Sequence, residues 1–415
     1  MFAKMGVPNG EMALFTSLLY LPWTIKPLWS PFVDVIKTKR WWTLTMQALM
    51  SVSFVVLTLT LARPVATMIE SGHTPMSMFT LTLILFVITA FASATHDIAA
   101  DGFYMLALEE KEQSFYVGIR STFYRLSNVF GQGVLVAIAG WIETNYNDIP
   151  LSWTVTLGIT AVLFTVVSLY HIFVLPRVET PETPESPENP DAPEIQEIQE
   201  IQERTAMGIL RGFGQSFATF FRKKGVWLAI LFMLLYRLPE AFLLKLCTPF
   251  LVADKSLGGL GMSTEAVGLA YGTIGVVFLT IGGIIGGVMA SRWGFKRSMW
   301  PMAACMTLPC LSFVYLSMSQ PQNFVVISTM IAIEQFGYGF GFTAYMLYMI
   351  HFAEGEFKTS HYAICTAFMA LSMMLPGMVA GYLQEWLGYA GFFWMVIVCC
   401  LATLAVTWIT KKALK

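Results

Sequence analysis

The residues of this sequence that could do chemistry are charged side chains placed inside long apolar stretches. A charge inside a membrane-spanning helix costs about 2.5–3.5 kcal/mol on insertion scales, so such a residue is a candidate for function by default. The candidate substrate-binding residues are Lys26, Arg125, Arg237, Glu240, Glu334 and Gln335. Cations can hold an anionic group, and carboxylates can pair with a cation or exchange a proton. The predicted chemistry is therefore binding and proton exchange.

Three carboxylates are candidates for proton coupling or gating. Glu334 stands about eleven residues into the apolar stretch 323–350, beside Gln335, and so near mid-membrane. A carboxylate is costliest at that depth, which favours a role in the site. Asp97 and Asp101 are four residues apart and share one helix face. Neighbouring carboxylates influence each other's protonation, which suits a proton site or a gate, and the structural alternative is an ion-pair network with a nearby cation.

The remaining charged candidates have two interpretations each. Arg237 and Glu240 are three residues apart, so they can pair within one helix, and Pro239 between them interrupts the backbone hydrogen bonds. Broken helices near the midplane recur at transporter binding sites. Lys26 stands mid-span and Arg125 is about eight residues into its span, so neither reaches water easily. Each of these two cations either meets cargo or a functional carboxylate, or forms a purely structural ion pair.

The composition places these residues in membrane helices. Of the 415 residues, 56% are hydrophobic and 12% are charged, whereas soluble proteins carry about 25% charged residues. This excludes a soluble enzyme and a fibrous or disordered chain. A spanning helix needs about 20 mostly apolar residues. We therefore predict an all-α integral membrane protein with eleven visible spans, at 12–33, 42–62, 76–96, 117–141, 152–175, 226–252, 264–290, 298–317, 323–350, 360–384 and 391–410.

A polar segment divides the spans into two groups. The pattern predicts a first membrane half at 1–175, a linker at 176–224 and a second membrane half at 225–415. Within the linker an acidic residue recurs at every third position from 179 to 203, which is typical of an extended, solvated strip. Lys and Arg gather in alternate short loops, and by the positive-inside rule these loops, the linker and the C-terminus are cytoplasmic.

Other classes of function find no support in the sequence. It contains no nucleophile elbow, zinc-protease motif, dinucleotide loop or soluble catalytic domain, so we predict that the protein is not an enzyme. All six cysteines lie in apolar stretches and no metal-ligand cluster is visible, so neither a cofactor nor a metal is expected. The basic residues are scattered between apolar spans, which excludes a nucleic-acid partner. The expected partner is the lipid bilayer, and a monomer is expected.

One loop resembles the signature loop of the major facilitator superfamily. It occupies 287–297 and contains Arg292, Gly294 and Lys296. The glycine permits a tight turn, and the cations can pair with carboxylates or with helix C-termini. The corresponding loop of the first half keeps an aspartate, Asp34, but lacks the glycines. The resemblance implies that these four residues act in the conformational change, whereas the alternative is a pair of ordinary positively charged loops.

Further segments are similar to AmpG-type muropeptide permeases of the same superfamily. They are 21–34, 97–102, 124–126, 236–242, 334–341 and 376–381, so the similarity covers nearly the whole chain except the linker. The resemblance implies a twelve-helix facilitator fold of two helical bundles, here lacking its first helix, as if the natural chain began upstream of Met1. It also implies proton-driven import of sugar-peptide fragments of the cell wall, such as anhydro-muropeptides, across the bacterial inner membrane. The alternatives are a carrier of another cargo, a sugar or a nucleotide thioester, and a non-transporting membrane sensor.

Overall fold

Every regular element in the described part of the chain is a helix. The computed structural model describes residues 7–62, 76–107, 123, 126–177, 208, 211–212, 214–355 and 357–414. The first half contains α1 (Asn9–Leu18), α2 (Leu21–Val35), α3 (Lys39–Ala62), α5 (Met76–Ala107), the π-helix η2 (Val129–Val134), α7 (Leu135–Tyr146) and α8 (Ile149–Val174). The second half contains α10 (Val226–Leu235), α11 (Leu238–Val252), η3 (Lys255–Leu257), α12 (Thr264–Val267), the π-helix η4 (Gly268–Gly275), α13 (Val276–Trp293), α14 (Phe295–Thr307), η5 (Leu308–Cys310), α15 (Leu311–Ser319), α16 (Phe324–Ala353) and α17 (Lys358–Ala413).

The helices have the length and composition that a membrane requires. In the described chain nine helical segments are long and apolar enough to cross a membrane, and several of them combine neighbouring elements, such as α10 with α11. The last, Ser360–Ala413, contains one non-helical residue, Gly388, between the two spans that the sequence predicts there. The prediction of an all-α membrane protein is confirmed, while the count of eleven spans stays a prediction. The segment 176–224 lies largely outside the described residues, so the linker boundaries also stay a prediction.

Two helices are broken by a proline in the same way, one in each half. α1 ends at Leu18 and α2 contains Pro22, while α10 ends at Leu235 and α11 contains Pro239. A proline has no N–H to donate to the carbonyl four residues before it, and that carbonyl belongs here to the last residue of the preceding helix. Sequence reasoning identified the second break from Pro239 but overlooked the first, although Pro22 stands inside the stretch 12–33 in the same way. Each half therefore carries an interrupted helix.

Two expected spans differ from the observed helices at their ends. The span expected at 76–96 belongs to a helix that runs to Ala107, because α5 continues through its aspartates instead of stopping at the first charge. The span expected to end at 141 belongs to α7, which ends at Tyr146, followed by Asn147 in the left-handed region (φ 49°, ψ 35°). Asp148 then caps α8 by accepting a hydrogen bond from the N–H of Leu151 at 2.9 Å. Apolar stretches of the sequence thus predict where the helices lie but not the residues at which they end.

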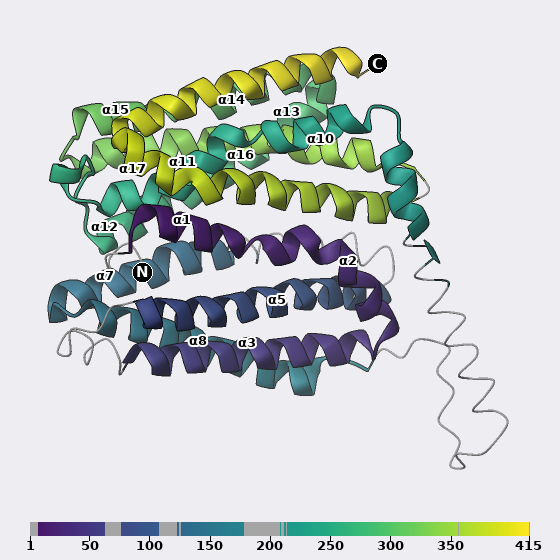
Figure 1. Ribbon diagram of the computed structural model, residues 1–415, viewed down its shortest axis with the longest axis horizontal. Helices are drawn as coiled ribbons and strands as arrows, with labels where there is room; N and C mark the ends of the chain where they lie inside the picture. Colours follow the sequence, from purple (N-terminus) through teal and green to yellow (C-terminus); the bar gives the residue numbers. More distant parts are fainter. Residues whose placement is uncertain are drawn as a thin grey trace.

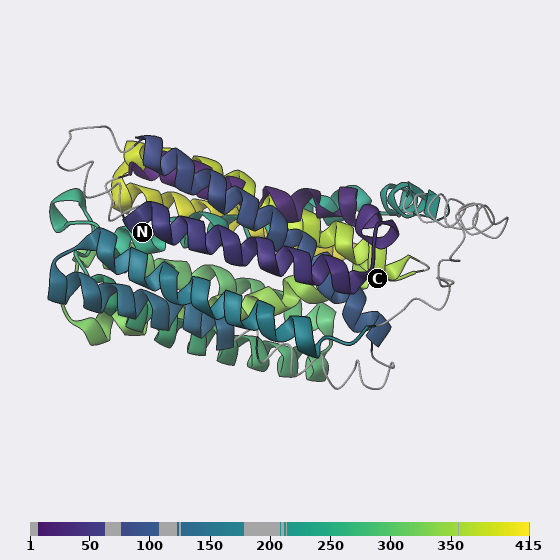
Figure 2. The ribbon, with the colours of Figure 1, turned by 90° about the horizontal axis from the view of Figure 1, so that it is seen from below.

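The long helices of both halves run along a common axis, so the molecule has two ends (Figures 1 and 2). The halves meet where α1 and α2 pack on α17 and where η2 and α7 pack on α12 and η4. Glycine makes these approaches possible. A Cβ on Gly272 of η4 would lie 1.8 Å from the carbonyl oxygen of Gln132, and one on Gly381 of α17 would lie 2.0 Å from that of Asn9. At these two glycines the backbones of helices from the two halves are in direct contact.

Hydrogen bonds between the halves gather at one end, where α7 ends and α12 begins (left in Figure 1). We call it the closed end. Four hydrogen bonds that involve side chains cross between the halves there, at 2.7–3.0 Å. They join Asn9 to Gln384 and Tyr389, the N–H of Gly10 to Glu385, and Thr264 to Glu143. The halves are therefore held together by polar contacts at this end.

Candidate substrate-binding site

Arg237 and Glu240 form a buried ion pair at the break between α10 and α11. The backbone of Arg237 is not helical (φ −98°, ψ 7°), and Pro239 lies in the first turn of α11, where a proline is tolerated. The guanidinium donates to both carboxylate oxygens of Glu240, at 2.9 and 2.7 Å. The two residues are 5% and 3% exposed, so the charges neutralise each other inside the second half.

An aromatic wall on α16 surrounds this guanidinium. Nη2 of Arg237 donates to Oη of Tyr338 at 3.0 Å. The guanidinium carbon lies 4.7 Å from the ring centre of Phe342 and 5.6 Å from that of Tyr345. Contacts of this kind are worth about 0.5–2 kcal/mol each. Tyr338 and Phe342 are only partly buried, so the wall also offers ring surface to a ligand.

Glu334 and Gln335 lie one turn before this wall on α16. Nε2 of Gln335 donates to Oε2 of Glu334 at 2.8 Å, and both side chains are buried. Glu334 is near enough to Glu240 for the two carboxylate charges to interact. Cys247 of α11 and Tyr271 of η4 are also near enough to interact with a charge on Glu334. In the described chain no cation forms an ion pair with Glu334. A buried carboxyl group without a cation suits proton exchange, because its protonation state depends on what comes near it.

Lys26 pairs with Asp97 inside the first half. Its Nζ lies 2.6 Å from Oδ2 of Asp97, and the bond joins α2 to α5. The side chains are 22% and 40% exposed, and exposed pairs of this kind contribute about 0–1 kcal/mol. Asp101 follows one turn later on α5, and the side chain of Lys39 from α3 lies against its neighbour Gly102. Asp97 is therefore engaged by a lysine of α2, and a second lysine, Lys39, approaches α5 one turn further on.

The remaining predicted residues are described only in part. Arg125 and the side chain of Asp34 lie outside the described residues. Gly294 joins α13 to α14 with φ 78°, a value that glycine adopts without strain. Arg292 is exposed in the last turn of α13, and Lys296 donates to a backbone carbonyl just beyond the end of α17. The second-half loop thus contacts the end of the last helix.

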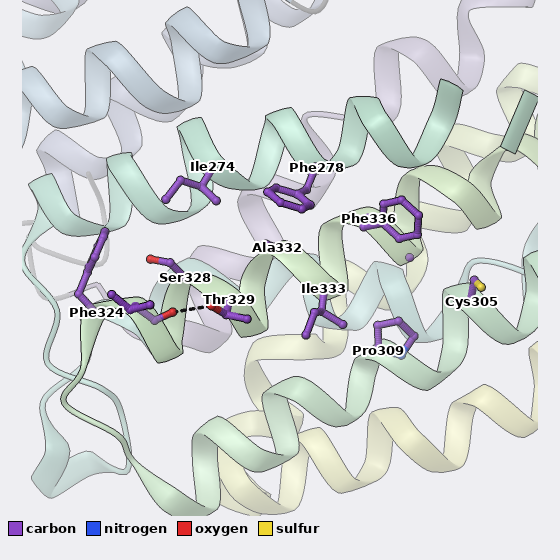
Figure 3. A pocket seen from close by; sticks show the side chains of 12 residues that line it. Ile274, Phe278, Cys305, Pro309, Phe324, Ser328, Thr329, Ala332, Ile333 and Phe336 are labelled. Atoms are coloured by element: carbon purple, nitrogen blue, oxygen red, sulfur yellow. Dashed lines mark hydrogen bonds between the residues drawn. The ribbon is translucent and has the colours of Figure 1, made fainter. Parts of the chain in front are cut away.

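One apolar cavity of the second half does not suit a polar cargo. It has a volume of about 480 Å³ and lies between α16 and the elements η4, α13, α14 and η5 (Figure 3). Its walls include the rings of Phe278 and Phe336. The hydroxyl of Thr329, which also lines it, donates its hydrogen bond to the carbonyl oxygen of Val325 at 2.7 Å. Among the described residues that line it, none is charged and none comes from the first half. Such a cavity suits a hydrocarbon chain rather than a sugar or a peptide.

Sequence reasoning missed two sets of polar contacts. Gln47 of α3 lies 3.0 Å from ring nitrogens of both His96 and His171, and so connects α3, α5 and α8. The position of Gln47, a polar residue inside the apolar stretch 42–62, could have indicated that it contacts other polar groups. The contacts of the closed end had no such signal, because Asn9 and Gln384 are 375 residues apart. Partners this distant are brought together only by the packing of the two halves.

Two helical halves, an interrupted helix in each and a buried charge pair define a membrane protein built like a transporter. The family model of the Major Facilitator Superfamily matches residues 2–359, and the chain belongs to this superfamily. Solved structures agree. The nucleoside transporter NupG superposes with a TM-score of 0.67 at 14% identity, covering 100% of this chain and 93% of that one. A D-xylose-proton symporter superposes with a TM-score of 0.64 at 15% identity, covering 97% and 87%. At these identities the likeness shows the fold alone.

Curated relatives include permeases of the AmpG type. The anhydromuropeptide permease of Escherichia coli (strain K12) is 22% identical, over 100% of this chain and 76% of the permease. Putative transporter AmpG 4 of Rickettsia conorii is 22% identical, over 92% of this chain and 84% of its own. Putative transporter AmpG 3 of Rickettsia prowazekii is 24% identical, over 91% and 82%. The predicted resemblance is confirmed: the chain is a multi-pass membrane transporter of the facilitator superfamily with AmpG-type relatives.

Proposed function

We propose that the protein is a proton-coupled importer of cell-wall muropeptides, that is, of anhydro-sugar peptides. The observation that carries the proposal is the aromatic-walled pair of Arg237 and Glu240 beside Glu334, in a chain similar along its whole length to an anhydromuropeptide permease. A sugar-peptide presents ring faces, amides and carboxylates. The site offers aromatic rings, the amide of Gln335 and basic groups to match them.

In this proposal Glu334 exchanges the coupling proton. Its described hydrogen bond is to a neutral amide, so its charge is not fixed by a permanent cation. A cargo that changes the polarity near Glu334 changes its affinity for a proton, and by linkage protonation changes the affinity for cargo. Asp97 is engaged by Lys26, which favours a gating role for the aspartates of α5 over a proton role.

Alternating access then requires the closed end to open. Four hydrogen bonds hold it, and each contributes about 0.5–1.5 kcal/mol net. A total of a few kcal/mol is small enough for bound cargo to shift the equilibrium between two arrangements of the halves. By the positive-inside rule the closed end faces outward. The described arrangement would then be the state from which an imported cargo leaves toward the cytoplasm.

Competition during uptake tests the choice of cargo. Purified protein in lipid vesicles should take up labelled anhydro-muropeptide, and an excess of unlabelled anhydro-muropeptides should block this uptake. Simple sugars and nucleotide thioesters should not compete. Uptake that is blocked by a sugar or a nucleotide thioester would instead assign the protein to another cargo. Binding of a muropeptide without any uptake or exchange would favour a non-transporting sensor.

A further inference from the structure

Lys245 of α11 is a second cation inside the span Val226–Val252. It stands eight residues after Arg237, about two turns along the same side. It is partly buried, and its Nζ lies 6.0 Å from the centre of the Tyr20 ring, which belongs to the first half. Within the described chain no carboxylate pairs with Lys245 and no hydrogen bond from its ammonium group is found. A cation from one half therefore faces an aromatic ring from the other half.

Two hydroxyl-bearing residues of the first half lie near this lysine. Tyr20 stands at the break between α1 and α2, where the chain turns after Ser17. Ser17 is fully buried, and its hydroxyl has no hydrogen-bond partner in the described chain. Ser17 and Lys245 also flank one point of α17. A Cβ on Gly377 would lie 2.3 Å from the Oγ of Ser17 and 3.4 Å from the Cε of Lys245. The hydroxyl of Ser17 and the Cε of Lys245 thus approach one position of α17 from opposite halves.

The other two cations within the described spans of the site already have carboxylates. Arg237 is neutralised by Glu240, and Lys26 pairs with Asp97. An ammonium group has three hydrogens to donate, and Lys245 has only an aromatic ring at the outer limit of a cation–π contact. An ionisable residue placed within a membrane span at a cost in insertion energy marks a functional position. Among the described residues Lys245 has no anionic partner.

We propose that Lys245, together with Ser17 and Tyr20, forms a subsite that binds a carboxylate group of the cargo at the interface of the two halves. The ammonium group would supply the charge, and the hydroxyls of Ser17 and Tyr20 would donate hydrogen bonds to the carboxylate oxygens. Because the residues come from both halves, a bound carboxylate connects α1 and α2 to α11. This inference rests on the proposed function for the identity of the cargo, but not for the class of group that is bound.

Matched ligand pairs test the subsite directly. Binding to purified full-length protein is measured for an anhydro-muramyl peptide and its carboxamide, a tripeptide and its amide, and glucuronate and glucuronamide. At least one carboxylate should bind about tenfold or more tightly than its amide, as expected for hydrogen bonds to a charged group. Lys245→Met, which keeps the side-chain length, should abolish that preference by weakening the binding of the carboxylate about tenfold or more, and much more than that of the amide. Lys245→Arg should keep part of the preference.

Two controls separate the possible failures. Lys255→Met alters an exposed lysine of η3 beyond α11 and should leave the preference intact. Lys245→Gln replaces Lys245→Met if the latter does not fold. A protein that ignores the muramyl peptide but prefers another carboxylate through Lys245 would contradict the proposed cargo and uphold the subsite. A wild type without any carboxylate preference, or a Lys245 variant that keeps it, would overturn the subsite.

Discussion

Breaking the buried ion pair of α11 should cost much more stability than removing it as a whole. Glu240→Gln keeps the side-chain shape but removes the negative charge. The guanidinium of Arg237, 5% exposed, would retain only an amide oxygen and Oη of Tyr338 as acceptors. Leaving one member of a buried pair uncompensated costs about 3–5 kcal/mol. Since the pair has two hydrogen bonds of 2.7 and 2.9 Å, we expect the upper part of that range.

The double variant Arg237→Gln/Glu240→Gln removes both charges and should recover most of this loss. Thermal unfolding is measured in one lipid mixture for the wild type, for Glu240→Gln and Arg237→Gln, and for the double variant. These four proteins form a double-mutant cycle, and we expect an interaction energy of at least about 1.5 kcal/mol. The half-exposed pair of Lys26 and Asp97 is the matched control, because Asp97→Asn should cost no more than about 1 kcal/mol. If Glu240→Gln were as stable as the wild type, or if the two single effects simply added, the pair would not be a buried, mutually dependent unit.

Three further predictions concern coupling, access and packing. Glu334→Gln should abolish uphill, pH-driven uptake but keep cargo counterflow, since the amide mimics the protonated acid; unchanged uphill uptake would move the proton role elsewhere. Asn9→Cys/Gln384→Cys places two thiols where side chains now meet at 2.7 Å, so oxidation should stop transport and reduction should restore it. Transport by the fully cross-linked protein would show that the closed end need not open. Gly272→Ala should lower the yield of folded protein sharply, because its Cβ would lie 1.8 Å from a carbonyl oxygen of η2, whereas Gly287→Ala, with open space around it, should not. Equal yields for both would contradict the close backbone contact.

Depth within a span was the most informative property of the sequence. The stretch predicted at 226–252 coincides with the candidate span Val226–Val252, and Glu334, placed near mid-membrane by counting residues, is buried on α16. The pairing of Arg237 with Glu240 was also within reach, because residues three apart on a helix are neighbours. These inferences depend on local periodicity and length, which a single sequence carries.

Partners from different helices were beyond the sequence. Lys26 was expected to meet either a carboxylate or cargo, and only the packing of α2 on α5 assigns it to Asp97, 71 residues away. The unpaired state of Lys245 and its contact with Tyr20 likewise depend on how the two halves are arranged. Membrane helices of similar hydropathy can pack in many ways. The pattern of charges along the chain therefore limits which residues could pair with each other, but it does not determine the actual pairs.

In proton-coupled import, cargo and protons cross the membrane together, and transport into vesicles can follow both. Vesicles containing the wild-type protein and an internal pH indicator are given labelled anhydro-muropeptide under an inward proton gradient. We predict that the cargo accumulates above its external concentration, and that adding cargo acidifies the vesicle interior in proportion to the uptake. Cargo that only equilibrates, or that accumulates without moving protons, would rule out proton-coupled import.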